Sequence, residues 1–448
     1  MKTNTKKLIE YFPYMPTNDQ KLVMQHAECF LEPESKEDFL ILLGSAGTGK
    51  STVIKGITDF MAERQLPFVL AGPTAKAARR MAQASGHSAN TIHSLIFIPE
   101  KQENSSAIIF RRKEVQANEP IVYIVDEASM ISNQDQKSAG FESGSLLCNF
   151  IDYVKAGNKR SKIIFIGDKY QLPPVGSQYS PALNDVFLKQ QYSLTGSTVE
   201  LTTVMRQAEG SYILDEATRL RGCLDKGISY GRPSCMMLDR GVEAVNKYIE
   251  LYDASSYSKV TILAWRNADV NAFNRLIRNR MGLSHTSLMA GDRITLHRNW
   301  YHSRGILMKG EVGTVKQITS TIRTNSGLRF VKAKIEFPLL NGETTVFESS
   351  ILLDTLENEN GDLTFQKENE LHAFANKHNE KFRKSGSPVD DEFVGAMRIR
   401  YAHAITCHKA QGSEWETVIL HPIMPSTDLR WKYTAITRAS RELFSFAA

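Results

Sequence analysis

A glycine-rich segment early in the chain constrains the fold more than any other feature. Residues 44–51 read Gly-Ser-Ala-Gly-Thr-Gly-Lys-Ser, between an apolar run at 39–43 and a helical pattern at 51–64. Backbone N–H groups of such a loop can face a phosphate, and the following helix N-terminus favours an anion. We expect Lys50 to reach the β- and γ-phosphates of ATP and Ser51 to bind Mg²⁺. The residues predicted at the nucleotide are Gly47, Thr48, Gly49, Lys50, Ser51 and Thr52.

Two adjacent carboxylates follow another apolar run. Residues 124–130 read Ile-Val-Asp-Glu-Ala-Ser-Met, so Asp126 and Glu127 come directly after a predicted strand. Asp126 is suited to hold Mg²⁺ through water, and Glu127 to orient and deprotonate an attacking water. Alone, the pair would also suit a solvated acidic turn after a core strand. Combined with the glycine loop, it predicts a P-loop nucleoside triphosphatase.

The composition excludes several other classes of protein. The chain has 448 residues, 42% of them hydrophobic and 23% charged, which rules out disorder throughout. Its five cysteines include no C-x-x-C pair, which argues against a disulfide scaffold or a cysteine-ligated zinc site. The net charge of +6 permits a polyanionic partner without requiring one. No apolar run approaches the roughly 20 residues of a membrane helix, and the polar residues 1–20 do not resemble a signal peptide, so we expect a soluble, cytoplasmic protein.

The apolar runs indicate two α/β regions, and the segment between them has a different hydrophobic pattern. Continuous, strand-length runs alternate with helical stretches in the first half, which favours a parallel sheet covered on both faces. A second such pattern begins at 260–264 and returns at 418–420. Between them, from about 291 to 348, short alternating runs and an Asn341-Gly342 turn predict a small antiparallel barrel. Residues 365–384 predict an amphipathic helix.

Several further segments together resemble the motifs of superfamily 1 helicases. Residues 167–175, Gly-Asp-Lys-Tyr-Gln-Leu-Pro-Pro-Val, are similar to motif III, residues 406–414 to motif V and residues 433–439 to motif VI. Residues 72–78 and 91–95 are similar to the motif Ia region of the RecD/Dda/Pif-like branch. Ala75 stands where Dda-type members carry a larger residue, so this segment is closer to RecD. The barrel and residues 133–145 match no family motif.

The resemblance implies an α/β fold with two RecA-like P-loop NTPase cores, a β-hairpin insertion in the first and a small SH3-like β-barrel in the second. The implied boundaries are residues 1–95 and 120–195 for the first core, 96–119 for the hairpin, 196–288 and 396–448 for the second core, and 289–395 for the barrel with a helical arm.

The resemblance also assigns residues to the ATP site. Gln20 would read the adenine edge through its amide; the alternative is a helix capped at Thr17 or Asn18 with Gln20 an ordinary surface residue. Gln171 would touch the γ-phosphate or its water, while Arg206 and Arg438 would stabilise charge on that phosphate. Surface salt bridges, and a plain turn for Gln171, are the alternatives. The resemblance further places Gln411 and Gly412 at the nucleotide.

A nucleic-acid track is implied on both cores. The implied DNA-binding residues are Pro73, Thr74, Lys76, Thr91, His93 and Phe97 in the first core and Thr406, His408 and Lys409 in the second. His93 could instead be a packed loop histidine, and for Arg79 and Arg80 we prefer a solvated helix face.

The hairpin is predicted from two apolar runs, 95–98 and 107–110, around a polar turn at 99–106. Relatives carry a duplex-separating pin there, so Phe97 or Phe110 could form a wedge and residues 111–113 could hold a phosphate. The alternative is a hairpin that has no part in duplex separation and packs its phenylalanines in a local core.

The resemblance implies an ATP-dependent DNA helicase moving 5′→3′, with single-stranded DNA and 5′-tailed duplex as partners. A monomer is expected, with replication or repair proteins as further partners. The rivals are a single-strand-stimulated translocase that displaces proteins with little unwinding, a nucleotide-switched binding module without turnover, and RNA specificity.

Overall fold

The chain forms two compact units. The computed structural model describes residues 6–101, 108–135, 144–204, 212–283, 287–303, 305–339, 343–356 and 362–447. Unit 1 spans Met1–Glu100 and Ile108–Leu214, and unit 2 spans Asp215–Leu339 and Glu343–Ala448. No helix in the described part of the chain is long and apolar enough to span a bilayer.

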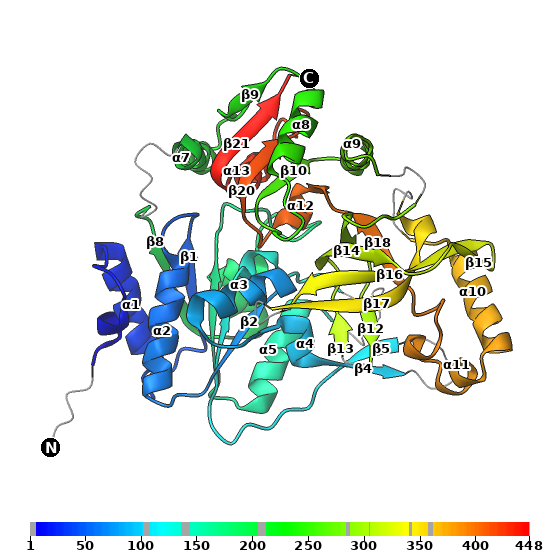
Figure 1. Ribbon diagram of the computed structural model, residues 1–448. Helices are drawn as coiled ribbons and strands as arrows, with labels where there is room; N and C mark the ends of the chain where they lie inside the picture. Colours follow the sequence, from blue (N-terminus) through cyan, green and yellow to red (C-terminus); the bar gives the residue numbers. More distant parts are fainter. Residues whose placement is uncertain are drawn as a thin grey trace. The chain divides into compact units, whose positions relative to one another are not determined.

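Unit 1 is built on a parallel sheet of six strands in the order β3-β2-β6-β7-β1-β8. Figure 1 labels β1, β2 and β8 of this sheet. The strands are β1 (Phe39–Gly44), β2 (Phe68–Gly72), β3 (Ala89–Thr91), β6 (Val122–Val125), β7 (Lys162–Gly167) and β8 (Gly196–Leu201). The helices are α1 (Asn18–Leu31), α2 (Lys50–Glu63), α3 (Ala75–Ser85), α4 (Ile92–Ile96), α5 (Leu146–Gly157) and α6 (Asp185–Tyr192), with short 3₁₀ turns at Leu8–Tyr11, Ala128–Met130 and Pro181–Leu183.

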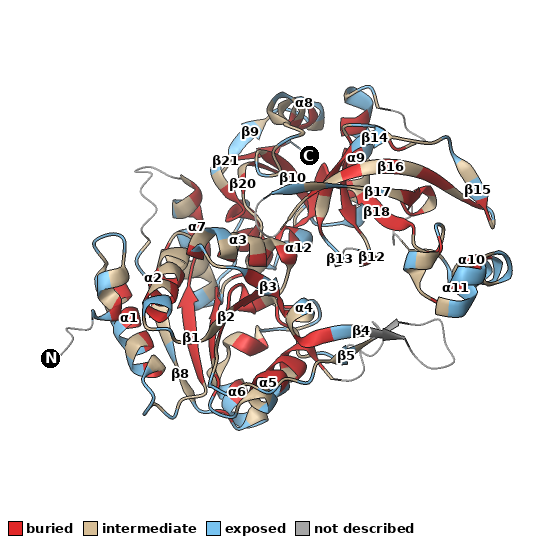
Figure 2. Cartoon of the chain, turned by 60° about the horizontal axis from the view of Figure 1, so that its bottom comes forward, coloured by how far each residue is buried: buried red, intermediate tan, exposed pale blue. Residues whose placement is uncertain are grey.

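Both faces of this sheet are covered. Leu40 and Leu42 of β1 pack in a core with α1, α2 and α3, and Phe39 and Ile41 pack in another with α4, α5 and α6. All six residues of β1 are buried (Figure 2). Alternate side chains of a strand point to opposite faces, so continuous apolar runs are what a doubly covered sheet requires, as predicted.

One predicted boundary is wrong. The sequence interpretation ended the first core at residue 195, but β8 pairs along its length with β1 and belongs to the first sheet. The strand reads Gly-Ser-Thr-Val-Glu-Leu and is only partly buried, because it lies at the edge of the sheet. Its weak apolar pattern gave no signal that it belonged there.

The predicted hairpin is present as a two-stranded sheet of β4 (Phe97–Lys101) and β5 (Ile108–Arg112). Its tip, residues 102–107, lies outside the described residues. Phe97 is buried in the core against α4 and α5, and Phe110 packs on the same core. This burial favours the alternative in which the phenylalanines of the hairpin belong to a local core, and the assignment of Phe97 to a DNA contact stays a prediction.

Unit 2 contains a second parallel sheet, in the order β19-β10-β20-β21-β9. Its strands are β9 (Met236–Leu238), β10 (Val260–Ala264), β19 (Ala404–Thr406), β20 (Trp415–Leu420) and β21 (Ala439–Phe446). The helices of this part of the chain are α7 (Tyr212–Lys226), α8 (Gly241–Leu251), α9 (Asn267–Arg280), α12 (Cys407–Ala410) and α13 (Leu429–Ile436).

The predicted barrel is confirmed. Strands β14, β11, β18, β17 and β16 pair in that order, and β16 pairs back to β14, which closes the ring. Unlike the prediction, one pairing is parallel, between β17 and β18, because the chain leaves the barrel between them. The strands are β11 (Arg293–Leu296), β14 (Val312–Ile318), β16 (Leu328–Pro338), β17 (Thr344–Leu352) and β18 (Met397–Tyr401), with β15 (Arg323–Asn325) beside β16 and a small pair β12 (Trp300–His302) and β13 (Gly305–Leu307). The Asn341-Gly342 turn lies outside the described residues.

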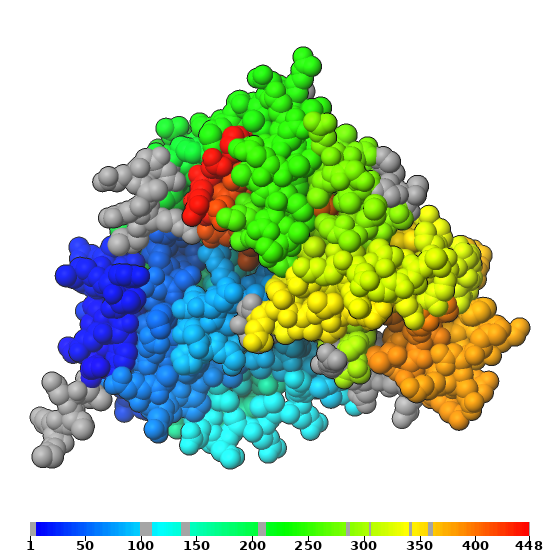
Figure 3. Space-filling view, in the orientation of Figure 1, coloured from blue at the N-terminus to red at the C-terminus, as the bar shows by residue number. Residues whose placement is uncertain are grey.

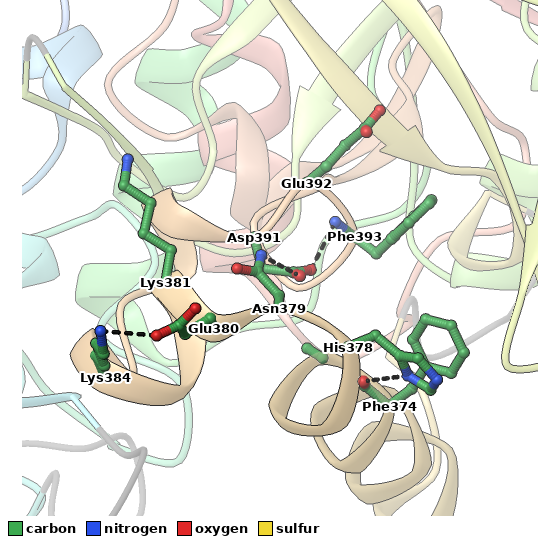
Figure 4. A pocket seen from close by; sticks show the side chains of 10 residues that line it. Phe374, His378, Asn379, Glu380, Lys381, Lys384, Asp391, Glu392 and Phe393 are labelled. Atoms are coloured by element: carbon green, nitrogen blue, oxygen red, sulfur yellow. Dashed lines mark hydrogen bonds and ion pairs between the residues drawn. The ribbon is translucent and has the colours of Figure 1, made fainter.

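A helical arm fills the excursion between β17 and β18. It contains α10 (Phe365–His378) and α11 (Glu380–Ser385), with 3₁₀ turns at Leu353–Thr355 and Pro388–Asp390. Leu371 and Phe382 anchor it on Phe330 of β16, and Figure 3 shows the arm in orange beside the yellow barrel strands. A cavity of about 670 Å³ lies in the arm, lined by residues that include Phe374, His378, Lys381 and Phe393 (Figure 4). No predicted site residue lines this cavity.

A buried ion pair joins the second sheet's helix α9 to the start of the barrel. Arg278 Nε and Nη2 donate to the two carboxylate oxygens of Asp292 at 2.7 and 3.0 Å, and neither side chain is more than 2% exposed. His403 Nε2 lies 3.7 Å from Asp292 Oδ1. Burial alone would raise the pKa of Asp292, but the nearby His403 and the hydrogen bonds from Arg278 outweigh it and lower that pKa.

We expect Asp292→Asn to lower the free energy of unfolding of unit 2 by about 3–5 kcal/mol, because it leaves the Arg278 charge buried without its counter-ion. Urea unfolding of the full chain measures the loss. The matched control is Glu380→Gln, in the exposed pair of Lys384 and Glu380, which should change stability by less than about 0.5 kcal/mol. Equal effects of the two substitutions would contradict the role given to the buried pair.

Candidate functional site

The predicted residues of unit 1 gather at one edge of its sheet. In a parallel sheet all strands end at the same edge. The glycine loop follows β1, Asp168 and Gln171 follow β7, and the acidic pair follows β6. Strand β7 lies between the other two, with Leu43 opposite Gly167 and Val125 opposite Phe165. Segments more than 120 residues apart in the chain thus meet at adjacent strand ends.

The glycine loop has the backbone that its sequence predicts. Gly47 and Gly49 have φ of 82° and 89°, a region that side chains disfavour. Lys50 begins α2, and its ammonium donates to the carbonyl oxygens of Gly44 (2.7 Å) and Ser45 (3.1 Å). The Lys50 charge is therefore held within the loop, and Ser51 and Thr52 stand in the first turn of the helix.

The two carboxylates are buried together. Asp126 and Glu127 are 8% and 6% exposed, and Asp126 Oδ1 accepts a hydrogen bond from the Glu127 N–H at 2.8 Å. Burial and the neighbouring Glu127 raise the pKa of Asp126, while Lys50 and Arg80 oppose the rise. The solvated-turn alternative does not fit this burial.

Glu127 also has a φ of 52°. A left-handed backbone at a residue other than glycine costs about 1 kcal/mol or more, and such strain gathers at functional sites.

Gln171 is the third group at these strand ends. It is 3% exposed, and its Oε1 has no hydrogen-bond partner among the described residues. Its backbone N–H donates to the carbonyl of Asp168 at 3.2 Å. The burial of Gln171 favours a role beyond that of a plain exposed turn, and its assignment to the γ-phosphate stays a prediction.

Gln20 lies against the glycine loop. Thr17 caps α1, and its backbone N–H donates to Gln20 Oε1 at 3.0 Å. Gln20 Nε2 donates to the Thr48 carbonyl at 3.2 Å, and the residue is 2% exposed. The cap in the alternative interpretation is present, but Gln20 is not a surface residue.

Asp19, which the sequence interpretation missed, joins two segments of unit 1 beside Gln20. Its Oδ2 accepts from the backbone N–H groups of Thr202 and Thr203 at 2.7 and 2.8 Å. Against partial burial, the hydrogen bonds from Thr17, Thr203, Thr202 and Gln20 lower its pKa to about 2. Asp19 therefore ties the start of α1 to the end of β8.

The predicted DNA residues of the first core follow the next two strands, β2 and β3. Thr74 and Thr91 cap α3 and α4, with each hydroxyl accepting a backbone N–H at 3.2 and 3.1 Å. These caps are structural roles that a Thr before a helical pattern could have indicated. Pro73, Lys76 and His93 are partly exposed. Arg80, assigned to a solvated face, acts electrostatically on Asp126.

In unit 2 the predicted residues follow β19. Thr406 ends that strand, and His408 and Lys409 stand on α12. Burial lowers the pKa of His408. Desolvation, with the nearby cations Arg400 and Lys309, lowers the pKa of Lys409 to about 8, although its side chain reaches solvent.

The predicted ATP-site residues of unit 2 lie close to one another in the chain. Gln411 is buried and Gly412 has a φ of 71°. Arg438 is 3% exposed and donates to the carbonyls of Thr434 and Ser413, both at 3.0 Å. Its guanidinium is thus held by its own unit rather than exposed in a surface salt bridge. Arg206 lies outside the described residues.

Two protein-family models match parts of the chain. An AAA domain model matches residues 19–222, and a UvrD-like helicase C-terminal domain model matches residues 401–444. The chain is 25% identical to the ATP-dependent RecD2 DNA helicase of Deinococcus radiodurans over 96% of its own length but 50% of that protein's. It is 24% identical to the ATP-dependent DNA helicase dda of Enterobacteria phage T4, covering 92% of this chain and 95% of dda.

Solved structures support the same fold. A structure of Pif1 helicases at forked double-stranded DNA matches with a TM-score of 0.52 and 17% identity, covering 96% of this chain and 92% of that one. Pif1 from Bacteroides with ADP-AlF3 and single-stranded DNA matches with a TM-score of 0.50 and 18% identity over the same shares. A Pif1 helicase of Psychrobacter is 23% identical over 68% of this chain and 43% of its own length. The chain is thus a homologue of the superfamily 1 helicases of the RecD2, Dda and Pif1 types.

Proposed function

We propose that the chain is an ATP-dependent DNA helicase that hydrolyses ATP with Mg²⁺ and moves 5′→3′ along single-stranded DNA to unwind a duplex. The observation that carries the proposal is the order of strand ends in unit 1. The glycine loop, Gln171 and the acidic pair follow β1, β7 and β6, and the predicted DNA residues follow β2 and β3 along the same edge. A nucleotide and a DNA strand bound there would be neighbours, as coupling between them requires.

The residues at this edge suit the chemistry. Ser51 and Asp126 offer the oxygen ligands that Mg²⁺ prefers, and the bound ion would neutralise charge on the phosphates. In this proposal Lys50 binds the phosphates, Glu127 takes a proton from the attacking water, and Gln171 orients that water with its unpartnered oxygen. One hydrogen and one lone pair of the Gln20 amide are left for adenine. Arg206, Arg438, Gln411 and Gly412 stay predicted contributors.

One observation favours the rival translocase that displaces proteins with little unwinding. Of the two candidate wedges of the hairpin, Phe97 is buried in the core of unit 1 and Phe110 is partly buried against the same core. A strand-displacement assay beside an ATPase assay separates the two functions, because only the helicase releases a strand from a tailed duplex.

Glu127→Gln should abolish turnover while keeping nucleotide and DNA binding, because it removes the proton acceptor and leaves Asp126 and Lys50 in place. Single-strand-stimulated ATPase and fluorescent-nucleotide binding measure the two properties. Lys50→Ala should lose both turnover and tight nucleotide binding. Near wild-type hydrolysis by Glu127→Gln would remove Glu127 from the mechanism.

Lys409 predicts a pH dependence of DNA binding. With a pKa lowered to about 8, its ammonium is charged below that pH and neutral above it, so affinity for single-stranded DNA should fall as pH rises from 7 to 9.5. The slope of log affinity against log salt concentration should decrease in magnitude by about one over that range, because one phosphate contact is lost. Lys409→Arg, which stays charged, is the matched control and should remove the pH dependence. Equal pH profiles of the two proteins would contradict this role.

The direction of movement is proposed from the RecD, Dda and Pif1 relatives and has its own test. A duplex with only a 5′ single-stranded tail should be unwound, and its 3′-tailed twin of the same sequence should not. Preferential unwinding of the 3′-tailed duplex would overturn the direction and leave the helicase proposal standing.

A further inference from the structure

A tryptophan with an exposed ring stands at the end of β10. The chain has four tryptophans; Trp300, Trp415 and Trp431 are at most 6% exposed, whereas Trp265 is 44% exposed. The three residues that follow Trp265 are exposed as well. A single exposed apolar side chain is common, but Trp265 is distinguished by the residues that lie beside it.

Trp265 lies next to the predicted DNA residues of unit 2. Strands β10 and β19 are parallel neighbours, with Ala264 opposite Thr406. Trp265 is the first residue beyond β10, and His408 and Lys409 come just beyond β19. The aromatic ring and the predicted phosphate-binding residues therefore emerge from adjacent strands at one edge of the sheet.

The backbone at Trp265 is fixed on both sides. It follows a fully buried strand and precedes Arg266, which caps α9. Arg266 Nε and Nη2 donate to the two carboxylate oxygens of Asp269, both at 2.7 Å. This hydrogen bonding lowers the pKa of Asp269 and keeps the pair charged. A ring on a rigid backbone loses little conformational freedom on binding.

Three cations from three elements lie near this edge: Lys309 and Lys409 are exposed, and Arg400 is 5% exposed. Arg400 of β18 and Lys309, just before β14, both act on the charge of Lys409 on α12. Arg400 Nη2 also donates to Asn271 Oδ1 at 3.0 Å, which brings the barrel to the helix that begins after Trp265. Like charges held together favour a polyanion, and an exposed ring beside them suits a nucleobase better than an apolar protein surface.

We propose that Trp265 is a base-stacking platform and that Lys309, in the barrel insertion, joins Lys409 in holding the backbone phosphates of the same single strand, while the buried Arg400 adds positive charge beside them. The inference deepens the proposed function, on which it rests. It gives the barrel insertion a direct part in strand binding, which none of its sequence motifs indicated.

The test compares oligothymidylate of 15 nucleotides with an abasic oligomer of the same length, which has the phosphates but no bases. Trp265→Ala should weaken binding of oligothymidylate roughly 5- to 150-fold, the range for loss of one stacked base, and should change binding of the abasic oligomer less than about twofold. Trp265→Phe should restore most of the affinity. The matched control, Phe365→Ala, removes a ring that is 83% exposed on the arm and should leave both affinities unchanged.

Two further readouts separate stacking from a general loss of structure. Oligothymidylate should quench the tryptophan fluorescence of the wild type, and the quench should disappear in Trp265→Phe because the remaining tryptophans are buried. Lys309→Gln should weaken both oligomers alike and lower the salt slope by about one. Equal losses on both oligomers in Trp265→Ala, or no loss on either, would overturn the stacking role alone. A wild-type protein that binds neither oligomer would overturn the proposed function together with this inference.

Discussion

Parallel strand pairing is the constraint on which the rest of this structure depends. Each strand of the first sheet runs in the same direction as its neighbours, so every crossover must carry the chain back across a face before the next strand begins. All five loops that hold the predicted residues of unit 1 consequently open at one edge. This topology creates the candidate site, because it brings together the glycine loop and Gln171, which are far apart in the sequence. In unit 2 the predicted DNA residues Thr406, His408 and Lys409 likewise lie at the end of β19, which pairs in parallel with β10, whereas the predicted ATP-site residues Gln411, Gly412 and Arg438 precede β20 and β21.

Burial at that edge strengthens the electrostatic interactions among the carboxylates and Lys50. Asp126 and Glu127 lie side by side away from water, which disfavours two negative charges and raises the pKa of Asp126. Lys50 and Arg80 oppose that rise, so the positive charge of the glycine loop partly sustains the negative charge that a metal ion would need. At the same edge, the left-handed backbone of Glu127 and the buried oxygen of Gln171 each reduce the stability of the fold locally. Backbone strain of this kind gathers at functional sites, which agrees with the function proposed for this edge.

The sequence was most informative where one residue type is required by local geometry. Glycines with positive φ, apolar runs of strand length and acidic residues at strand ends have few substitutes, so the loop, the first sheet and the barrel could be predicted. Contacts between distant segments could not: β8 joins the first sheet through its pairing with β1, and Phe97 is covered by α4 and α5. Thr74 and Thr91 illustrate a second limit, because one hydroxyl can cap a helix and face a ligand, and a sequence pattern does not separate these roles.

The barrel is fastened to the second sheet at both of its ends. The chain leaves that sheet after β10 and α9, builds the barrel and its arm, and returns through β18 into β19, which pairs with β10 itself. Arg278 on the way out bonds Asp292, and His403 on the way back lies against the same carboxylate, so the two connections share one buried charge. Along β18, Met397 and Ile399 point into the barrel core while Arg398 and Arg400 alternate with them on the opposite face. A shift of the barrel would therefore have to break the buried ion pair of Arg278 and Asp292, and for this reason we regard the barrel and the second sheet as one rigid body within unit 2.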